Sequence, residues 1–365
     1  MKNSRDEDLA KRFYFLNIAV SIVLLIVIVI SIFQFGAATF EGQKAIGIIL
    51  PGKTDDFGWN QSQYEGLNRV ASRLNMELIP VEEVKADKRS LATAVDKLVK
   101  RRVKTVFFSN SESLENAAEV SQTRRNISFF GIEAEKSDAK IQKYAIRYAE
   151  AYYLAGIIAG LKTSTNKVGF IAPHASPNIN QMINAFALGA RKIRSDAQIF
   201  LIWTGEFKSP THEEQAVRDL KANNIDVISY FADGGTIADA AARARIDFIS
   251  IFSTHQSVHN LATITVNWEN IYTNIFRREK AGIKTPYTAS IADRGIEVIL
   301  NQKLNARGAA IFEAEVFEIK DGKNVFTGPI TDNRGIMRVG ANEVISRRNL
   351  DKMGYLVEGV KTLGN

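Results

Sequence analysis

The sequence contains no cysteine among its 365 residues. Disulfide bonds, thiolate metal ligands and a lipid-modified cysteine behind a signal sequence are therefore excluded. Histidine is scarce as well, with four residues, and no G-x-S-x-G motif occurs. Because no nucleophile stands beside a base, we predict a protein that is not an enzyme, with no catalytic residues and no metal or cofactor.

Two short segments match known catalytic or binding motifs but lack features that the chemistry of those motifs needs. Gly47–Thr54 matches the phosphate-loop pattern, but half of it reads as a strand and Pro51 would interrupt a cradle of backbone N–H groups. His255 and His259 have the spacing of a zinc-protease helix, yet Gln256 stands where a general-base Glu is needed. Neither motif predicts chemistry.

The formal net charge is +7, but the basic residues are scattered in small groups near the ends of predicted helices. This distribution is typical of solvated helix faces, and we predict no nucleic-acid partner.

The N-terminus carries one long apolar run, Phe13 to Phe35, preceded by Lys2, Arg5, Lys11 and Arg12. The run is long enough to cross a bilayer, and the positive-inside bias places residues 1–12 in the cytoplasm as a short tail. Residues 13–38 are predicted to form a transmembrane anchor or, if cleavage follows the small residues at 36–38, a signal peptide. Either alternative places the rest of the chain on the extracytoplasmic (periplasmic) side of the cytoplasmic membrane.

After this segment, short β-branched and aromatic runs alternate with stretches of helical periodicity. Runs about 30 residues apart are typical of a strand, a crossover helix and a returning strand. The runs fall into two sets of four, which begin near residues 46, 77, 105 and 128, and near 168, 198, 226 and 248.

The repeat predicts an α/β fold of two doubly wound parallel-sheet lobes joined by a hinge, in addition to the N-terminal transmembrane helix. Within a binding domain at 44–365, we expect lobe one at about 44–148 and lobe two at about 165–255. The remaining residues, 256–365, would be shared between the lobes and contain a hairpin near Asp332–Gly335.

Parallel sheets bind ligands beyond the carboxyl ends of their strands, so the cleft between the lobes is the expected site. Aromatic rings and carboxylates at these ends favour a flat, hydroxyl-rich ligand, because rings can sandwich a heterocycle and carboxylates accept hydrogen bonds from sugar hydroxyls. Ten residues there are the candidate ligand contacts: Asp56, Trp59, Asn60, Ser109, Trp203, Phe231, Asp233, Gly234, His255 and Trp268.

The segment DFGWNQSQYEGL at 56–67 resembles the first ligand loop of the Bmp family (basic membrane protein, PnrA-like), the substrate-binding proteins of certain ABC importers. Similar segments follow in order, among them YAEAYYLAGIIAG at 148–160, KVGFIA at 167–172 and VFTGPITDNRGIMRV at 325–339. The resemblance covers residues from about 44 to 365.

The resemblance implies a type I periplasmic-binding-protein fold and a cleft for purine nucleosides or bases. It implies hydrogen bonds to the ligand from Asp56 and Asn60, aromatic contact from Trp59, and a lobe-two ligand loop at Asp233 and Gly234. Trp268 is similar to the tryptophan of the purine-binding branch. His255 stands nearest the family's sugar-binding acid, which this chain lacks.

Three functions from different classes follow. The leading interpretation is a membrane-anchored solute-binding protein that delivers a purine nucleoside or base to an ABC permease and ATPase. The alternative is a ligand sensor that signals to a membrane partner. A nucleoside-cleaving enzyme is the third, with only the pair Asp56 and Asp233 to support it.

Overall fold

The computed structural model describes residues 23–25, 44–56, 58–132, 140–252 and 255–363. The expected tail at 1–12 and the anchor or signal segment at 13–38 lie outside this range, except for residues 23–25. Within the described part of the chain, no helix is long and apolar enough to cross a membrane.

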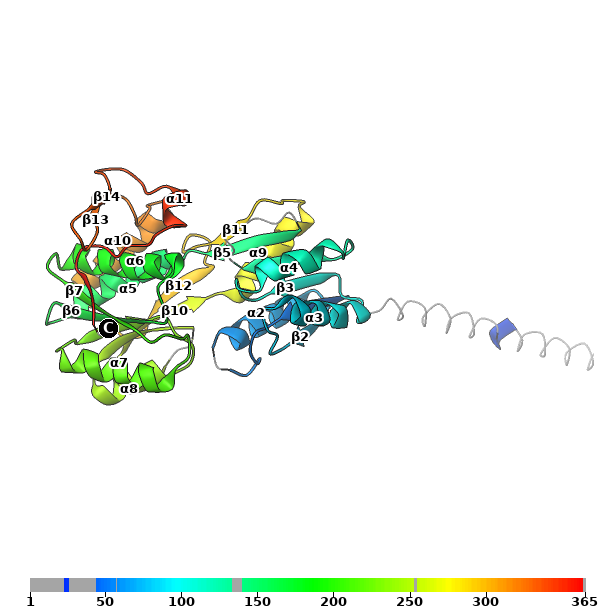
Figure 1. Ribbon diagram of the computed structural model, residues 1–365, viewed down its shortest axis with the longest axis horizontal. Coiled ribbons are helices and arrows are strands. Elements are labelled where there is room, and N and C mark those ends of the chain that lie inside the picture. Colours follow the sequence, from blue (N-terminus) through cyan, green and yellow to red (C-terminus); the bar gives the residue numbers. More distant parts are fainter. Residues whose placement is uncertain (1–22, 26–43, 57, 133–139, 253–254, 364–365) are drawn as a thin grey trace, which may run out of the picture.

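The chain folds into two α/β lobes that lie end to end (Figure 1). Lobe one contains a six-stranded sheet in the order β11-β5-β4-β3-β1-β2, in which every pairing is parallel. Its strands are β1 (Ala45–Ile49), β2 (Glu77–Val81), β3 (Thr105–Phe108), β4 (Ser128–Ile132), β5 (Ile141–Ile146) and β11 (Tyr287–Ala289).

Helices cover both faces of this sheet because its strands are apolar on both sides. Ile46 and Ile48 of β1 join the core with Leu67 of α2. Ile49 of the same strand packs in a second core with Leu91 of α3. The helices are α2 (Trp59–Arg73), α3 (Lys88–Lys100), α4 (Leu114–Gln122) and α9 (Trp268–Lys280), which packs against α2.

Lobe two repeats the design with a seven-stranded sheet in the order β12-β10-β9-β8-β6-β7-β15. Its strands are β6 (Lys167–Ala172), β7 (Gln198–Trp203), β8 (Val227–Tyr230), β9 (Asp247–Ile251), β10 (Asn260–Val266), β12 (Ile296–Leu300) and β15 (Val360–Thr362). Only β12 runs antiparallel to its neighbour. The helices are α5 (Tyr148–Lys162), α6 (Pro177–Ile193), α7 (Pro210–Ala222), α8 (Thr236–Ala244) and α10 (Ala306–Lys320).

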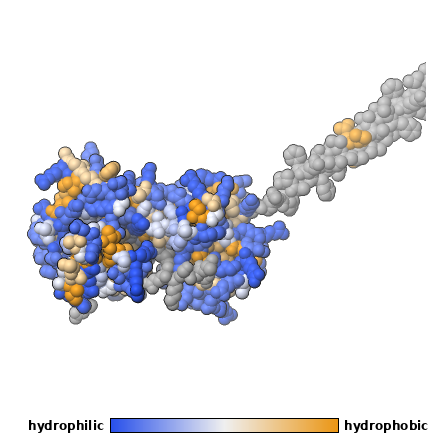
Figure 2. Space-filling view, turned by 90° about the horizontal axis from the view of Figure 1, so that it is seen from above, coloured by the Kyte–Doolittle hydropathy of each residue, from blue (hydrophilic) through white to orange (hydrophobic). Residues whose placement is uncertain are grey.

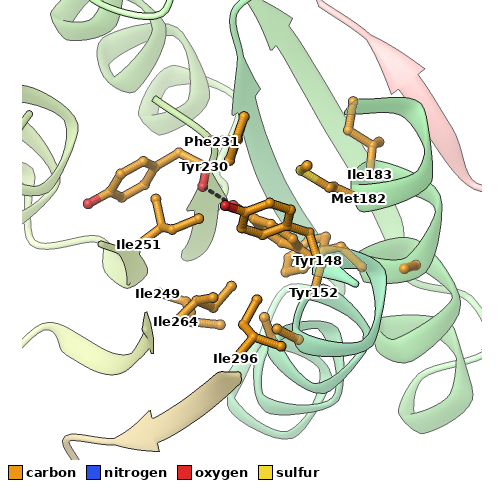
Figure 3. Packing of buried hydrophobic residues seen from close by; sticks show 14 of the residues in the cluster. Tyr148, Tyr152, Met182, Ile183, Tyr230, Phe231, Ile249, Ile251, Ile264 and Ile296 are labelled. Carbon is orange, nitrogen blue, oxygen red and sulfur yellow. Dashed lines mark hydrogen bonds between the residues drawn. The ribbon is translucent and has the colours of Figure 1, made fainter. Parts of the chain in front are cut away.

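The core of lobe two surrounds α5, which is buried on nearly all sides. Figure 3 shows Tyr148 and Tyr152 of this helix among Met182, Ile249, Ile264 and Ile296. The Tyr152 hydroxyl donates to the carbonyl of Tyr230 over 2.7 Å, which satisfies a polar group that would otherwise be costly to bury (Figure 3).

The chain crosses between the lobes three times. It passes from β5 to α5 at residues 146–148, from β10 to α9 at 266–268, and from β11 to β12 at 289–296. Arg147 N donates to Ala289 O and Asn267 N donates to Gly295 O, so the crossings are tied to one another. These connections form the hinge.

The C-terminal segment returns over lobe two, where it forms the hairpin of β13 (Ile330–Thr331) and β14 (Met337–Val339), and then α11 (Arg347–Leu350). Gly335, with φ +81°, occupies the expected turn. Asn184 of α6 is buried and pins the segment through Tyr355 O and Val357 N, each at 2.9 Å. The space-filling view from this side shows apolar residues in separate patches among polar ones (Figure 2).

Candidate functional site

The loops at the topological switch points of the two sheets face each other where the lobes meet. In each lobe the first strand has the second on one side and the third on the other, namely β2-β1-β3 and β7-β6-β8. The loops that leave such a pair of central strands diverge and open a crevice for ligands. The loops concerned are 50–58 and 109–113 of lobe one and 173–176 and 231–235 of lobe two.

The lobes touch at these loops. A Cβ atom placed on Gly58 would lie 3.6 Å from the backbone N of Gly234 and 3.7 Å from Oδ1 of Asp233. The Trp59 ring of lobe one lies 5.6 Å from the Phe252 ring of lobe two, edge to face. The structure is therefore that of the closed arrangement of the lobes.

Asp56 organises the lobe-one loop. Its Oδ1 accepts from the backbone N of Gly58 at 2.9 Å and of Gln61 at 3.0 Å, and its Oδ2 accepts from the backbone N and the Nδ2 of Asn60 at 3.2 and 2.7 Å. A carboxylate has about four acceptor positions, and all are used here. Asp56 thus caps α2, where a negative charge also suits the helix dipole.

Asn60 closes the same loop. Its Nδ2 is bonded to Asp56, and its Oδ1 accepts from Gly52 N at 3.4 Å. Both side chains lie at the loop that meets lobe two, and in the closed arrangement their hydrogen bonds are internal.

Trp59, Ser109 and Trp268 form the lobe-one wall. The indole Nε1 of Trp59 donates to Ser109 O at 3.0 Å, which ties the loop after β1 to the loop after β3. Trp268 is 2% exposed, meets Trp59 edge to face at 5.3 Å, and donates its Nε1 to Ser62 Oγ at 3.1 Å. The Trp59 ring therefore lies between Trp268, which supports it within lobe one, and Phe252 of lobe two.

A row of aromatic rings continues from Trp59 into lobe two. Phe252 lies 5.8 Å from Phe231, Phe231 lies 6.0 Å from Phe207, and Phe207 lies 5.4 Å from His174. Phe252 has φ +67°, in the left-handed region that bulky residues rarely adopt. Such backbone strain is typical of functional sites.

Asp233 is a partly buried acid at the place where the lobes meet. Its backbone N donates to Phe207 O at 2.7 Å, and Gly234 follows with φ +90°, which favours glycine. Burial is the main cause that raises the pKa of Asp233 from 3.8 to about 6, and the negative charge of Asp56 is the second. Lys208 opposes the rise, while Glu213 adds to it.

Two expected contacts lie at the edge of the group. The His255 ring covers Gly235 at the start of α8, and its Nδ1 is 3.7 Å from Asp239 Oδ1. Trp203 ends β7, one strand from the switch point, and among the described residues no ring contact joins it to the aromatic row.

The two short motifs have structural roles. Gly47 lies inside β1, and Thr54 donates from both N and Oγ1 to Glu82 Oε1 at 2.7 Å, so no phosphate cradle forms. His259 Nδ1 lies 2.9 Å from Asp247 Oδ1, apart from His255. No group of three or more metal-ligating side chains occurs in the described part of the chain.

Comparison with a family model identifies the family of this chain. The model of the Bmp family, described as ABC transporter substrate-binding protein PnrA-like, matches residues 43–302. The chain belongs to the Bmp family. Bmp proteins are extracytoplasmic solute-binding proteins of ABC transporters and not enzymes, as the sequence analysis predicted.

Characterised relatives of this chain are distant in sequence. A purine-binding protein of Brucella abortus is 24% identical over 342 residues, which cover 89% of this chain and 95% of that protein. A CD4+ T-cell-stimulating antigen of Listeria monocytogenes is 28% identical over 205 residues, with 53% of this chain and 55% of that protein covered.

Solved structures support the two-lobed, type I periplasmic-binding-protein fold. An ABC solute-binding protein of Conexibacter woesei has a TM-score of 0.64 at 18% identity, covering 76% of this chain and 97% of its own. A transcriptional activator of the comK gene from Bacillus halodurans has a TM-score of 0.65 at 16% identity, with 76% and 98% covered. At these identities the likeness establishes the fold alone.

Sequence reasoning missed several residues of the Bmp cleft. His174 could have been found, because it lies two residues after the end of the central strand β6. Phe207 and Lys208 lie in the loop between β7 and α7, and no local pattern predicts that this loop reaches the residues after β8. The aromatic row therefore includes residues that only the folded chain brings together.

Proposed function

We propose that this Bmp-family chain captures a purine base or purine nucleoside and delivers it to an ABC importer. The observation that carries the proposal is the row of aromatic rings at the switch point, next to the partly buried acid Asp233. Aromatic faces stack on a flat heterocycle, and a carboxylate accepts hydrogen bonds from its N–H groups. The similarity to a purine-binding protein over most of both chains supports the same ligand class.

The proposed contacts divide into residues that would shape the cleft and residues that would touch the ligand. Trp59 belongs to the second group through its ring, because its Nε1 is already bonded to Ser109 O. Asp56, Asn60 and Trp268 have internal partners and would shape the cleft. The direct contacts would come from Trp59, Ser109, Phe231, Asp233, Gly234 and His255, with Trp203 at the rim.

The buried hydroxyl of Ser109 supports a polar contact between lobe one and the ligand. Its side chain is fully buried, and its Oγ has no hydrogen-bond partner among the described residues. An unsatisfied buried hydroxyl is costly, and a ligand that enters between the lobes could provide the missing partner.

Titration calorimetry of the full chain in detergent tests the ligand class. We expect heat, and a rise in the thermal midpoint, with members of a panel of purine bases and purine nucleosides, and none with pyrimidines or free sugars. Absence of both signals with every purine would remove the purine proposal.

Phe231→Leu tests whether the aromatic row is the binding surface. Loss of stacking on the central ring should weaken binding about five-fold, in line with roughly 1 kcal/mol for an aromatic pair beyond its area. Phe200→Leu is the matched control, because Phe200 lies within β7 under Lys167 and away from the row. Equal affinities of the two variants would contradict the assignment.

Delivery to a transporter and signalling to a receptor are separated by the partner. The proposed anchor at 13–38 would hold the lobes at the extracytoplasmic face of the membrane, beside the permease. The sensor alternative draws support from a metabotropic glutamate receptor-like protein H of Dictyostelium discoideum, 32% identical over 154 residues that cover 40% of this chain and 20% of that protein. Copurification of a permease and an ATPase would favour transport, and copurification of a kinase or cyclase would favour sensing.

A further inference from the structure

Gln63 is a buried amide with both of its ends bonded. It lies on α2 one turn after Trp59 and has no exposed surface. Its Nε2 donates to Ser109 O at 3.0 Å, and its Oε1 accepts from the Tyr272 hydroxyl at 3.0 Å. Gln63 therefore connects three elements of lobe one: α2, the loop after β3, and α9.

The carbonyl of Ser109 receives two donors from one face of α2. Trp59 Nε1 and Gln63 Nε2 both lie 3.0 Å from this oxygen, and the two residues are four positions apart. Because the carbonyl is shared, the position of the Trp59 indole depends on where Gln63 holds Ser109.

Gln63 also acts on the second support of Trp59. The Tyr272 ring that it bonds stacks on Trp268 at 5.8 Å, with an angle of 26° between the planes. Trp268 in turn meets Trp59 edge to face at 5.3 Å. The amide of Gln63 thus acts on both lobe-one supports of the Trp59 ring: directly on the Ser109 carbonyl, and through Tyr272 on Trp268.

An apolar side chain of the same size could fill this space without desolvating an amide, so simple packing does not require Gln63. Fully satisfied buried polar networks restrict neighbouring groups to one geometry. We infer that Gln63 is a positioning residue that sets the orientation of the Trp59 ring, and through it the affinity of the cleft for a flat ligand. The affinity part of this inference rests on the proposed function.

The primary test is the variant Gln63→Met, which keeps the size of the side chain and removes both hydrogen bonds. We expect the indole N–H resonance of Trp59, assigned with Trp59→Phe in ¹⁵N-labelled full chain, to shift or broaden without ligand. We also expect the Kd for the tightest purine of the panel to rise about ten-fold.

Asn184→Leu is the matched control. Asn184 is likewise a fully buried amide with both ends bonded, but it lies on α6 of lobe two beneath the C-terminal segment. It should lower the thermal midpoint as Gln63→Met does, and leave the Trp59 resonance and the Kd unchanged. If Asn184→Leu raised the Kd equally, the effect would be general destabilisation and the inference would fail.

A second variant covers the possibility that Gln63→Met does not fold. In Gln63→Glu, a protonated carboxyl can donate to Ser109 O and accept from Tyr272, whereas a carboxylate cannot donate. Its Kd, divided by that of the unmodified chain at the same pH, should fall toward one as the pH is lowered. A ratio of one at every pH, or an unmoved Trp59 resonance, would overturn the inference. Absence of purine binding by the unmodified chain would instead overturn the proposed function, and the resonance test would still judge Gln63.

Discussion

The carboxylate of Asp56 is fully occupied by its own loop and the first turn of α2. We expect its influence on a ligand to act through the shape of that loop and through its charge beside Asp233. A residue at a strand end can be essential for a site without touching what the site binds.

Asp56→Ala should lower the free energy of unfolding by about 1–2 kcal/mol, the usual cost of a lost helix cap, and should also weaken purine binding. Asp87→Ala is the control, because Asp87 caps α3 in the same lobe by accepting from Ser90 N at 2.9 Å, away from the cleft. Urea denaturation and calorimetry on both variants would compare stability with affinity. Equal loss of affinity in the two would show that loop order at Asp56 has no special part in binding.

At the scale of elements, helices α5 and α6 approach so closely that a glycine of each helix leaves no room for a side chain. A Cβ on Gly156 would lie 2.1 Å from Phe186 O, and a Cβ on Gly189 would lie 2.1 Å from Tyr153 O. These neighbours are backbone atoms, which cannot rotate away.

Gly156→Ala should therefore separate the helices and lower the free energy of unfolding by about 1–3 kcal/mol, the range for an overpacked core. At Gly354 the nearest atom to an added Cβ is 3.8 Å away, so Gly354→Ala should change stability by less than about 0.5 kcal/mol. Thermal and urea unfolding of the two variants measure the difference. A Gly156→Ala protein as stable as the unmodified chain would disprove the close contact.

The strands that local pattern predicted are those with strong β-branched or aromatic runs. All eight predicted runs are strands, from β1 to β4 and from β6 to β9, and the hairpin near Asp332–Gly335 is also confirmed. β11 and β15 have three residues each and pair at or near the sheet edges. Such short segments become strands because a neighbouring strand offers its hydrogen-bonding edge, which no local pattern encodes.

For the whole molecule, closure couples the two acids of the cleft. In the closed arrangement burial and Asp56 raise the pKa of Asp233 from 3.8 to about 6. When the lobes part, Asp233 regains solvent and should return toward its ordinary value. The closed state then holds a proton more tightly than the open state between about pH 4 and pH 6.

The pH dependence of closure has one direction, because the pKa of Asp233 is higher in the closed state. Closure is least costly below about pH 4, becomes more costly as the pH rises to about 6, and stays at that cost above it. The interval between 3.8 and about 6 corresponds to roughly 3 kcal/mol. The radius of gyration by X-ray scattering should therefore increase with pH across this window in the absence of ligand.

Asp233→Asn should abolish this pH dependence, and Lys208→Met should move it to higher pH because it removes the cation that favours the ionised acid. The same pH profile in Asp233→Asn would assign the effect to other groups, among them the neighbouring acids Asp56 and Glu213.

The sequence by itself determined the α/β class, the duplicated lobes and the strand ends at which the site lies, because periodicity and spacing are local properties of the chain. Tertiary structure alone decided that Phe207 and His174 join Phe231 and Phe252 in one row, since these contacts depend on the paths of loops between distant strands. It also decided that Asp56 points back into α2 and that Trp268 is buried beneath Trp59. The direction of a side chain depends on which neighbours satisfy it, and those neighbours are chosen only when the two sheets are assembled.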